Sequence, residues 1–211
     1  MFIAIVAVVF FAGFAMTVRE GLWHNLLLLC HMILASVVAF GFYQPLTVWA
    51  DEAAGGEYTY ILDLMVFWGL FALTVTVLKT LGTTLSPVQV KFLHPLEKYA
   101  GPAFGLFCGL TLASIAAVSI HLAALPKDTM GGAILHDGGS ADSPSLITTS
   151  PDLAFLAAAE IFTDPNGLGD GGDFEPGPWV EDYAARRERF EGVMGAAKAA
   201  WELKVKRGGA R

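Results

Sequence analysis

The chain has 211 residues, of which 55% are hydrophobic and only 16% are charged, and its formal net charge is −7. An acidic chain of this kind is unsuited to binding nucleic acid, which is held by basic surfaces. Residues 1–122 carry only four of the thirteen Lys and Arg residues, whereas residues 123–211 carry fourteen of the twenty acids. The composition therefore predicts an apolar N-terminal part and a water-facing C-terminal tail.

Four apolar stretches lie in the N-terminal part, at residues 1–18, 26–43, 61–78 and 102–125. Each is about as long as the 17–25 residues that an α-helix needs to cross a bilayer. None of them alternates with the period of two that marks a membrane β-barrel. The first stretch has no Lys or Arg before Arg19, so it lacks the basic start of a cleaved signal peptide and is predicted to be retained. We predict an all-α membrane protein with a four-helix transmembrane domain at residues 1–125.

The loops between these stretches differ in charge. The first loop contains Arg19 and the third contains Lys91 and Lys98, whereas the second has three acids and no base. Cytoplasmic loops of membrane proteins are enriched in Lys and Arg. With a bacterial inner membrane as the working assumption, both termini and the tail are predicted to lie outside, in the periplasm.

Polar residues inside the spans are candidates for function, because charged groups are costly in lipid. His31 lies near mid-depth of the second span and, with Thr74 and Thr76, suggests a proton or ion path in a small channel or transporter subunit. The alternative is structural: His31 bonds a backbone carbonyl, and Asp63 caps the third span. No two histidines share a depth on different helices, so no cofactor is predicted. Motifs of hydrolases, phosphate loops and zinc enzymes are missing from the sequence, which predicts a protein that is not an enzyme.

The fourth stretch carries small residues at every fourth position. Residues four apart lie on one stripe of a helix, and a stripe of small side chains lets another helix approach closely. The stripe predicts helix packing, either with another helix of the same chain or with another subunit. Its members are Gly101, Gly105, Gly109, Ala113 and Ala117.

Residues 126–177 form a linker rich in Gly, Pro and Asp, with nine acids and one base, and are predicted to be largely irregular. A short helix is expected to begin at Pro151, behind Ser150 as its cap. Residues 164–175 partly match a calcium-binding loop, although Leu168 stands where an oxygen ligand is expected. A solvated acidic turn is the alternative to calcium binding. The weak calcium candidates are Asp164, Asn166, Asp170 and Glu175.

Residues 178–207 are predicted to form an amphipathic helix, because Trp179, Tyr183, Phe190, Met194 and Trp201 recur at helical spacing. Its apolar face suits three arrangements equally: contact with the outer leaflet, pairing with a partner or a second copy, or folding back on the membrane domain.

Two segments resemble the CvpA family of colicin V production proteins. One is the turn at residues 18–23, with Arg19 and Gly21, and the other is residues 93–109, with the pair Glu97 and Lys98 before the glycines. The resemblance covers residues 1–122. The chain departs from the family pattern at Glu20 and Cys108, where the family has Arg, and at His24 and Asn25, where it has an Arg-Glu pair.

The resemblance implies a small inner-membrane protein associated with colicin V production or export and with the cell envelope. The sequence hypothesis is therefore a non-enzymatic membrane scaffold or export accessory. Its expected partners are the lipid bilayer and either a second copy or other envelope membrane proteins.

Overall fold

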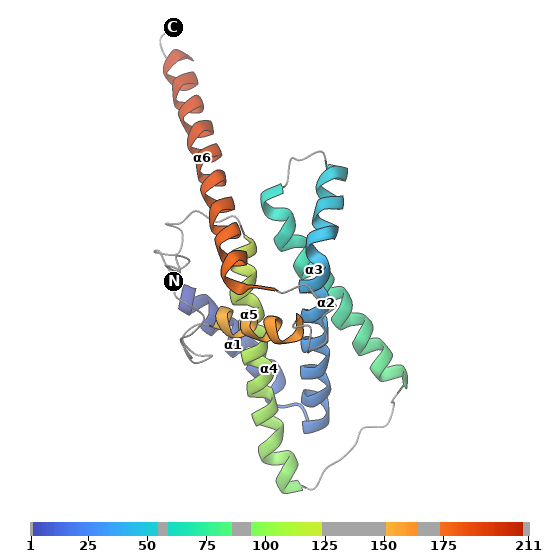
Figure 1. Ribbon diagram of the computed structural model, residues 1–211. Coiled ribbons are helices and arrows are strands. Elements are labelled where there is room, and N and C mark those ends of the chain that lie inside the picture. The colour runs from blue at the N-terminus through green and yellow to red at the C-terminus, as the bar shows by residue number, and fades with distance from the viewer. Residues whose placement is uncertain (1, 55–58, 86–93, 124–150, 164–173, 209–211) are drawn as a thin grey trace.

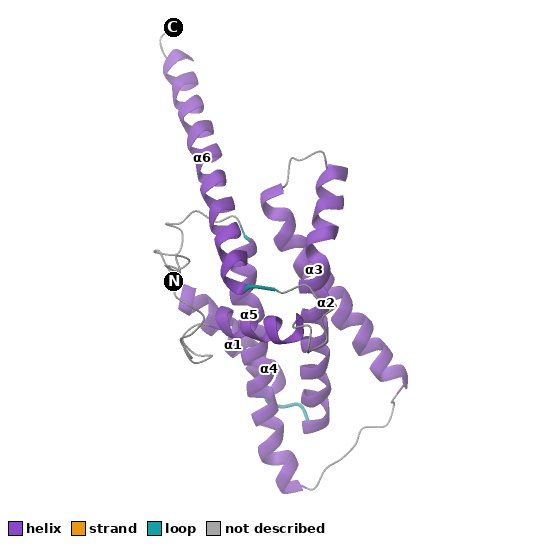
Figure 2. Cartoon of the chain, in the orientation of Figure 1, coloured by secondary structure: helices purple, strands orange, loops and turns teal. Residues whose placement is uncertain are grey.

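The computed structural model describes residues 2–54, 59–85, 94–123, 151–163 and 174–208, and within these ranges every regular element is a helix (Figure 2). The all-α class is thus confirmed. In chain order the helices are α1 (Phe2–Thr17), α2 (Leu22–Ala54), α3 (Thr59–Leu85), α4 (His94–Leu122), α5 (Pro151–Thr163) and α6 (Pro176–Gly208).

Three helices are long and apolar enough to cross a membrane, over Leu22–Ala53, Ile61–Thr84 and Glu97–Leu122. They correspond to the second, third and fourth predicted spans. Helix α1 has 16 residues. At 1.5 Å per residue it is about 24 Å long, shorter than the roughly 30 Å of hydrocarbon in a bilayer. That the first apolar stretch crosses the membrane, as the four-span fold requires, therefore stays a prediction.

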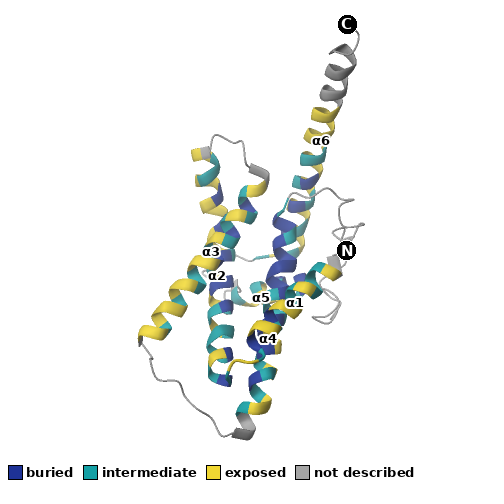
Figure 3. Ribbon diagram, turned by 180° about the vertical axis from the view of Figure 1, so that it is seen from behind, coloured by how far each residue is buried: buried dark blue, intermediate teal, exposed yellow. Residues whose placement is uncertain are grey.

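Helix α4 lies at the centre of the fold and contacts each of the other five helices. Helices α2 and α3 form an antiparallel hairpin beside it, α1 packs against its first half, and α5 crosses it at a steep angle (Figure 1). Seen from behind, much of α4 is buried, whereas α3 is largely exposed (Figure 3). Exposed side chains such as Phe11, Trp49 and Leu73 are apolar, as expected for helices that face lipid.

The glycine stripe of α4 lies directly against α1 and the turn that follows it. A Cβ atom built on Gly109 would lie 3.0 Å from the carbonyl oxygen of Phe10 and 3.2 Å from the nitrogen of Phe14. A Cβ on Gly105 would lie 3.0 Å from Thr17 Oγ1. The two backbones are therefore in contact at these glycines, and the structure places their neighbour within the same chain.

Asn25 joins the same helices by hydrogen bonds. Its side chain is fully buried, and its Nδ2 donates to the carbonyl oxygens of Thr17, at 3.0 Å, and of Gly101, at 2.9 Å. Thr17 is the last residue of α1, where helix carbonyls lack a partner within the helix. The Asn25 amide thus caps α1 and ties it to α4.

Gly109→Ala should destabilise the fold, because the added methyl group meets backbone atoms of α1 that have no rotamer by which to move away. We expect a cost of about 1–3 kcal/mol, measured as a lower Tm of the purified protein in detergent. Gly69→Ala is the matched control: nothing lies within 4 Å of a Cβ at Gly69 in α3, so its Tm should stay the same or rise. Equal Tm values for the two variants would contradict the close packing of α1 on α4.

Candidate functional site

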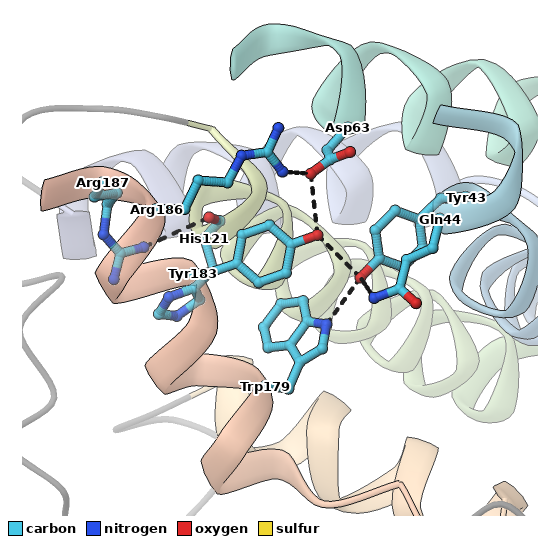
Figure 4. A network of polar contacts seen from close by, with 8 residues as sticks. All are labelled: Tyr43, Gln44, Asp63, His121, Trp179, Tyr183, Arg186 and Arg187. Atoms are coloured by element: carbon cyan, nitrogen blue, oxygen red, sulfur yellow. Dashed lines mark hydrogen bonds and ion pairs between the residues drawn. The ribbon is translucent and has the colours of Figure 1, made fainter. Parts of the chain in front are cut away.

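A cluster of polar and aromatic residues lies where the first turns of α6 meet the membrane helices (Figure 4). We name it the docking cluster. Helix α6 supplies four of its members, and α2, α3 and α4 supply the others. They are Tyr43, Gln44, Asp63, His121, Trp179, Tyr183, Arg186 and Arg187.

A chain of hydrogen bonds runs through the docking cluster. The Tyr43 hydroxyl oxygen accepts from Trp179 Nε1, at 2.8 Å, and from Gln44 Nε2, at 3.2 Å. The Tyr183 hydroxyl lies 3.1 Å from the Tyr43 hydroxyl and 3.1 Å from Asp63 Oδ2. A carboxylate only accepts, so Tyr183 donates to Asp63 and itself accepts the proton of Tyr43. Each hydroxyl proton in this series is thus donated toward the Asp63 carboxylate.

The series of hydrogen bonds ends at the carboxylate of Asp63. Asp63 is only 4% exposed, and Arg186 of α6 donates to the same carboxylate oxygen as Tyr183. Because α3 begins at Thr59, Asp63 lies a full turn inside the helix. The prediction that Asp63 caps this helix is therefore wrong: the carboxylate binds a base and a phenol of the tail instead.

Burial raises the pKa of the Tyr183 phenol, and the neighbouring Tyr43 raises it further. The hydroxyl therefore stays protonated over the physiological pH range and remains a donor to Asp63. Burial also lowers the pKa of Arg187, opposed by Glu191. Arg187 is 3% exposed, and its Nη1 lies 3.5 Å from the backbone carbonyl oxygen of His121. That carbonyl is among the last four of α4, which have no donor within the helix.

A second buried pair connects α4 to α5. His121 Nε2 lies 3.0 Å from Asp152 Oδ2, and the two residues are 3% and 1% exposed. Asp152 is the second residue of α5, where the positive end of the helix dipole favours an acid. The last turn of α4 thus contacts α5 through the His121 side chain and α6 through the His121 backbone.

The ring of Phe40 packs against three tail residues and one neighbour on α2. Its centroid lies 5.1 Å from that of Phe174, 5.6 Å from Phe155 and 5.7 Å from both Tyr43 and Trp179. Phe155 is on α5, and Phe174 precedes α6. Such aromatic pairs contribute packing beyond the area that they bury, so Phe40 joins both tail helices to α2.

Residues 3–137 match the family model described as Colicin V production protein. This match covers more than half of the chain. The chain belongs to the colicin V production protein family. In comparisons with curated proteins and with solved structures, it has no match.

The family match contains α1 to α4 and ends before α5 and α6. The docking cluster therefore joins the part that this chain shares with other colicin V production proteins to a part outside the match. Tyr43 and Asp63 lie on the matched side, and Trp179, Tyr183 and Arg186 on the other.

Other residues that the sequence singled out do not meet in this cluster. His31 packs against Gly82 of α3, whose Cβ position is 3.4 Å from His31 Cε1. The Thr76 hydroxyl is exposed and bonds back to the Ala72 carbonyl of its own helix, at 2.7 Å. Ala113 and Ala117 are buried in α4.

Of the calcium candidates, Glu175 is exposed before α6, whereas Asp164, Asn166 and Asp170 lie outside the described residues. Among the residues that the structure describes, no group of three His, Cys, Asp or Glu side chains could hold a metal ion.

Sequence reasoning flagged Asp63 and Tyr183 separately but did not pair them. The one signal was that Asp63 is an acid near the bilayer with no base close to it in the sequence. Tyr43 gave no signal, because an aromatic residue at a span end is common, and Asn25 was noted only as a departure from the family pattern, which did not indicate its buried hydrogen bonds.

Asp63→Ala should loosen the anchorage of α6, because Tyr183 and Arg186 lose their shared acceptor. With a cost of about 1.5–3 kcal/mol for a hydrogen bond to a charge, amide exchange at residues 179–187 should accelerate by about 10- to 150-fold. Hydrogen exchange with mass spectrometry on the full chain measures this. Asp182→Ala is the matched control, since Asp182 is an exposed acid on the same helix. Unchanged exchange in Asp63→Ala would contradict the anchoring role.

Proposed function

We propose that this protein is a non-enzymatic accessory of the cell envelope, a scaffold that holds α6 as an arm on the outer side of the inner membrane. One observation carries this proposal: the docking cluster fixes the first turns of α6 on the membrane helices, whereas residues 192–198 beyond them are exposed. Trp179, Tyr183 and Arg187 are buried, whereas every residue from 192 to 198 is exposed. A helix that is bound over its first turns and exposed beyond them suits a protein that positions a binding surface.

The length of α6 supports such a role. Its 33 residues correspond to about 50 Å of helix, and Figure 1 shows it projecting away from the bundle to the C-terminus. The exposed distal part carries apolar side chains, among them Val193, at 56% exposed, and Met194, at 54%. We name residues 192–208 the distal segment. Its partner in this proposal is another envelope membrane protein or a second copy.

The chemistry of the docking cluster supports a structural role over a catalytic one. The Tyr43 hydroxyl uses both of its lone pairs and its proton, and Asp63 Oδ2 accepts from two donors. A general base needs a reachable proton on a substrate, and these groups are directed at each other. The alternative of a channel past His31 has no comparable observation in its favour, because Thr76 faces outward.

The orientation is part of this proposal. The first turns of α6 bind Tyr43 in the second half of α2 and Asp63 near the beginning of α3. On this side, the end of α2 and the residues that follow it carry three acids and no base. At the opposite ends of these helices, Lys91 lies in the sequence between α3 and α4, and Lys98 lies in the first turns of α4. By the positive-inside rule, this distribution of charge supports an outer position for α6.

Removal of the distal segment should abolish function without unfolding the protein. In cells that make colicin V and lack their own family member, the full chain should restore secreted toxin, measured by inhibition of a sensitive strain. A chain ending at Glu191 should secrete at least tenfold less while it reaches the membrane at a normal level. Glu181→Ala, an exposed position in the anchored part of α6, serves as the control. Full secretion by the truncated chain would contradict the role of α6 as a binding arm. A failure of the full chain to restore secretion would contradict the export role.

Cysteine accessibility in whole cells tests the orientation. Cys30→Ser and Cys108→Ser provide the background, and serine at 108 keeps a donor near the Asn25 carbonyl, which lies 3.4 Å from the Cys108 sulfur. Single cysteines then replace Gly55, Ser86 and Ser143. An impermeant maleimide should label positions 55 and 143 and leave 86 protected. The reverse pattern would place the tail in the cytoplasm.

A further inference from the structure

A cavity of about 500 Å³ lies between α2, α4 and α5. From α2 it is lined by Ile33, Val37, Phe40 and Gly41, and from α4 by Phe107 and Leu110, among others. Ala154, Phe155, Ala158, Ala159 and Phe162 of α5 complete its wall. The volume lies within the roughly 300–1,000 Å³ of ligand pockets, and such apolar walls are typical of them.

We propose that this cavity binds an acyl chain of a membrane phospholipid. The inference is independent of the proposed envelope role and concerns the membrane domain itself.

The first observation that supports it is the depth of the cavity along the membrane spans. The lining residues of α2 lie midway along the span Leu22–Ala53, and those of α4 lie midway along Glu97–Leu122. The cavity is therefore at the level of the hydrocarbon core, where phospholipid chains are the surrounding solvent.

The second support is access. Val37 is 40% exposed and Phe107 is 53% exposed, and both line the cavity. The cavity therefore opens on the outer surface of the helices, at the depth at which that surface meets lipid. A chain can enter sideways from the bilayer without crossing a polar region.

The third support is the chemistry of the walls. Water needs several polar partners to occupy a cavity, and apolar cavities remain dry. Among the hydroxyl groups in the wall, Ser36 donates to the Ile33 carbonyl of its own helix, at 2.7 Å. Aliphatic and aromatic side chains make up most of the remainder, so a hydrocarbon chain matches the site and water does not.

Small residues create the space. Nothing lies within 4 Å of a Cβ atom at Gly41, and α5 contributes alanines at 154, 158 and 159. Interiors are otherwise packed to the density of organic crystals. The first carbon of a side chain at Gly41 therefore meets no neighbour, and a larger side chain there should occupy part of the cavity.

Photocrosslinking tests the proposal on the full chain in nanodiscs. The probe is a phosphatidylglycerol with a diazirine halfway along one acyl chain. Mass spectrometry should find the adducts concentrated on α5 and on residues 107–114. Gly41→Leu should reduce them at least fivefold, and Gly69→Leu should not, because Gly69 also has open space but does not line the cavity.

A second pair of variants covers the case in which Gly41→Leu fails to fold, as judged by its Tm. Ala157 and Ala158 are both exposed on α5, and only Ala158 lines the cavity. Ala158→Leu should reduce the adducts at least fivefold, and Ala157→Leu should leave them unchanged. Adducts spread evenly over the exposed faces of α2, α3 and α4 would overturn the proposal. Equal yields from the two members of either pair would overturn it too.

Discussion

The buried carboxylate of Asp63 is the constraint on which the position of the tail depends. A carboxylate removed from water is costly unless a cation and hydrogen-bond donors compensate it. No base lies near Asp63 on the membrane helices in the sequence, since Lys79 is at the far end of α3. Arg186 and Tyr183 of α6 supply the charge and the proton. The first turns of α6 are thereby fixed beside α2 and α3, and with them the aromatic contacts of Trp179 and Phe40.

A different kind of contact fixes the other side of the membrane domain. Within lipid, apolar burial gives little reason for helices to associate, so close van der Waals contact and hydrogen bonds decide the packing. At Gly105 and Gly109 the backbones of α4 and α1 touch, and the Asn25 amide satisfies carbonyls of both helices. The short helix α1 is thus held by its close backbone contact with α4 and by the hydrogen bonds of Asn25. This explains how a helix of 16 residues keeps a defined place without the length of a full span.

Hydrophobicity and periodicity predicted the helices of the membrane domain, because the requirement for internal backbone hydrogen bonds in lipid leaves few alternatives. The glycine stripe predicted a close neighbour but not which one, since a stripe offers the same surface to any helix. The apolar face of α6 was equally ambiguous: Trp179 and Tyr183 are suited to lipid, a partner or the chain itself. Asp63 and Arg186 could not be paired from sequence, because 123 positions and a long linker separate them. Tertiary contacts of this range leave no local pattern.

The docking cluster lies across the boundary of the family match, and this has a physical consequence for related chains. Asp63 and Tyr43 belong to residues 3–137, whereas the groups that satisfy them belong to α6. A membrane domain of the same fold without such a tail would leave the carboxylate buried with no base. The position would then need an apolar residue, or a cation from another subunit. An acid at this position and an amphipathic tail helix that carries an arginine should therefore occur together. Without the helix the acid is a buried charge with no base, and without the acid the helix has no anchor.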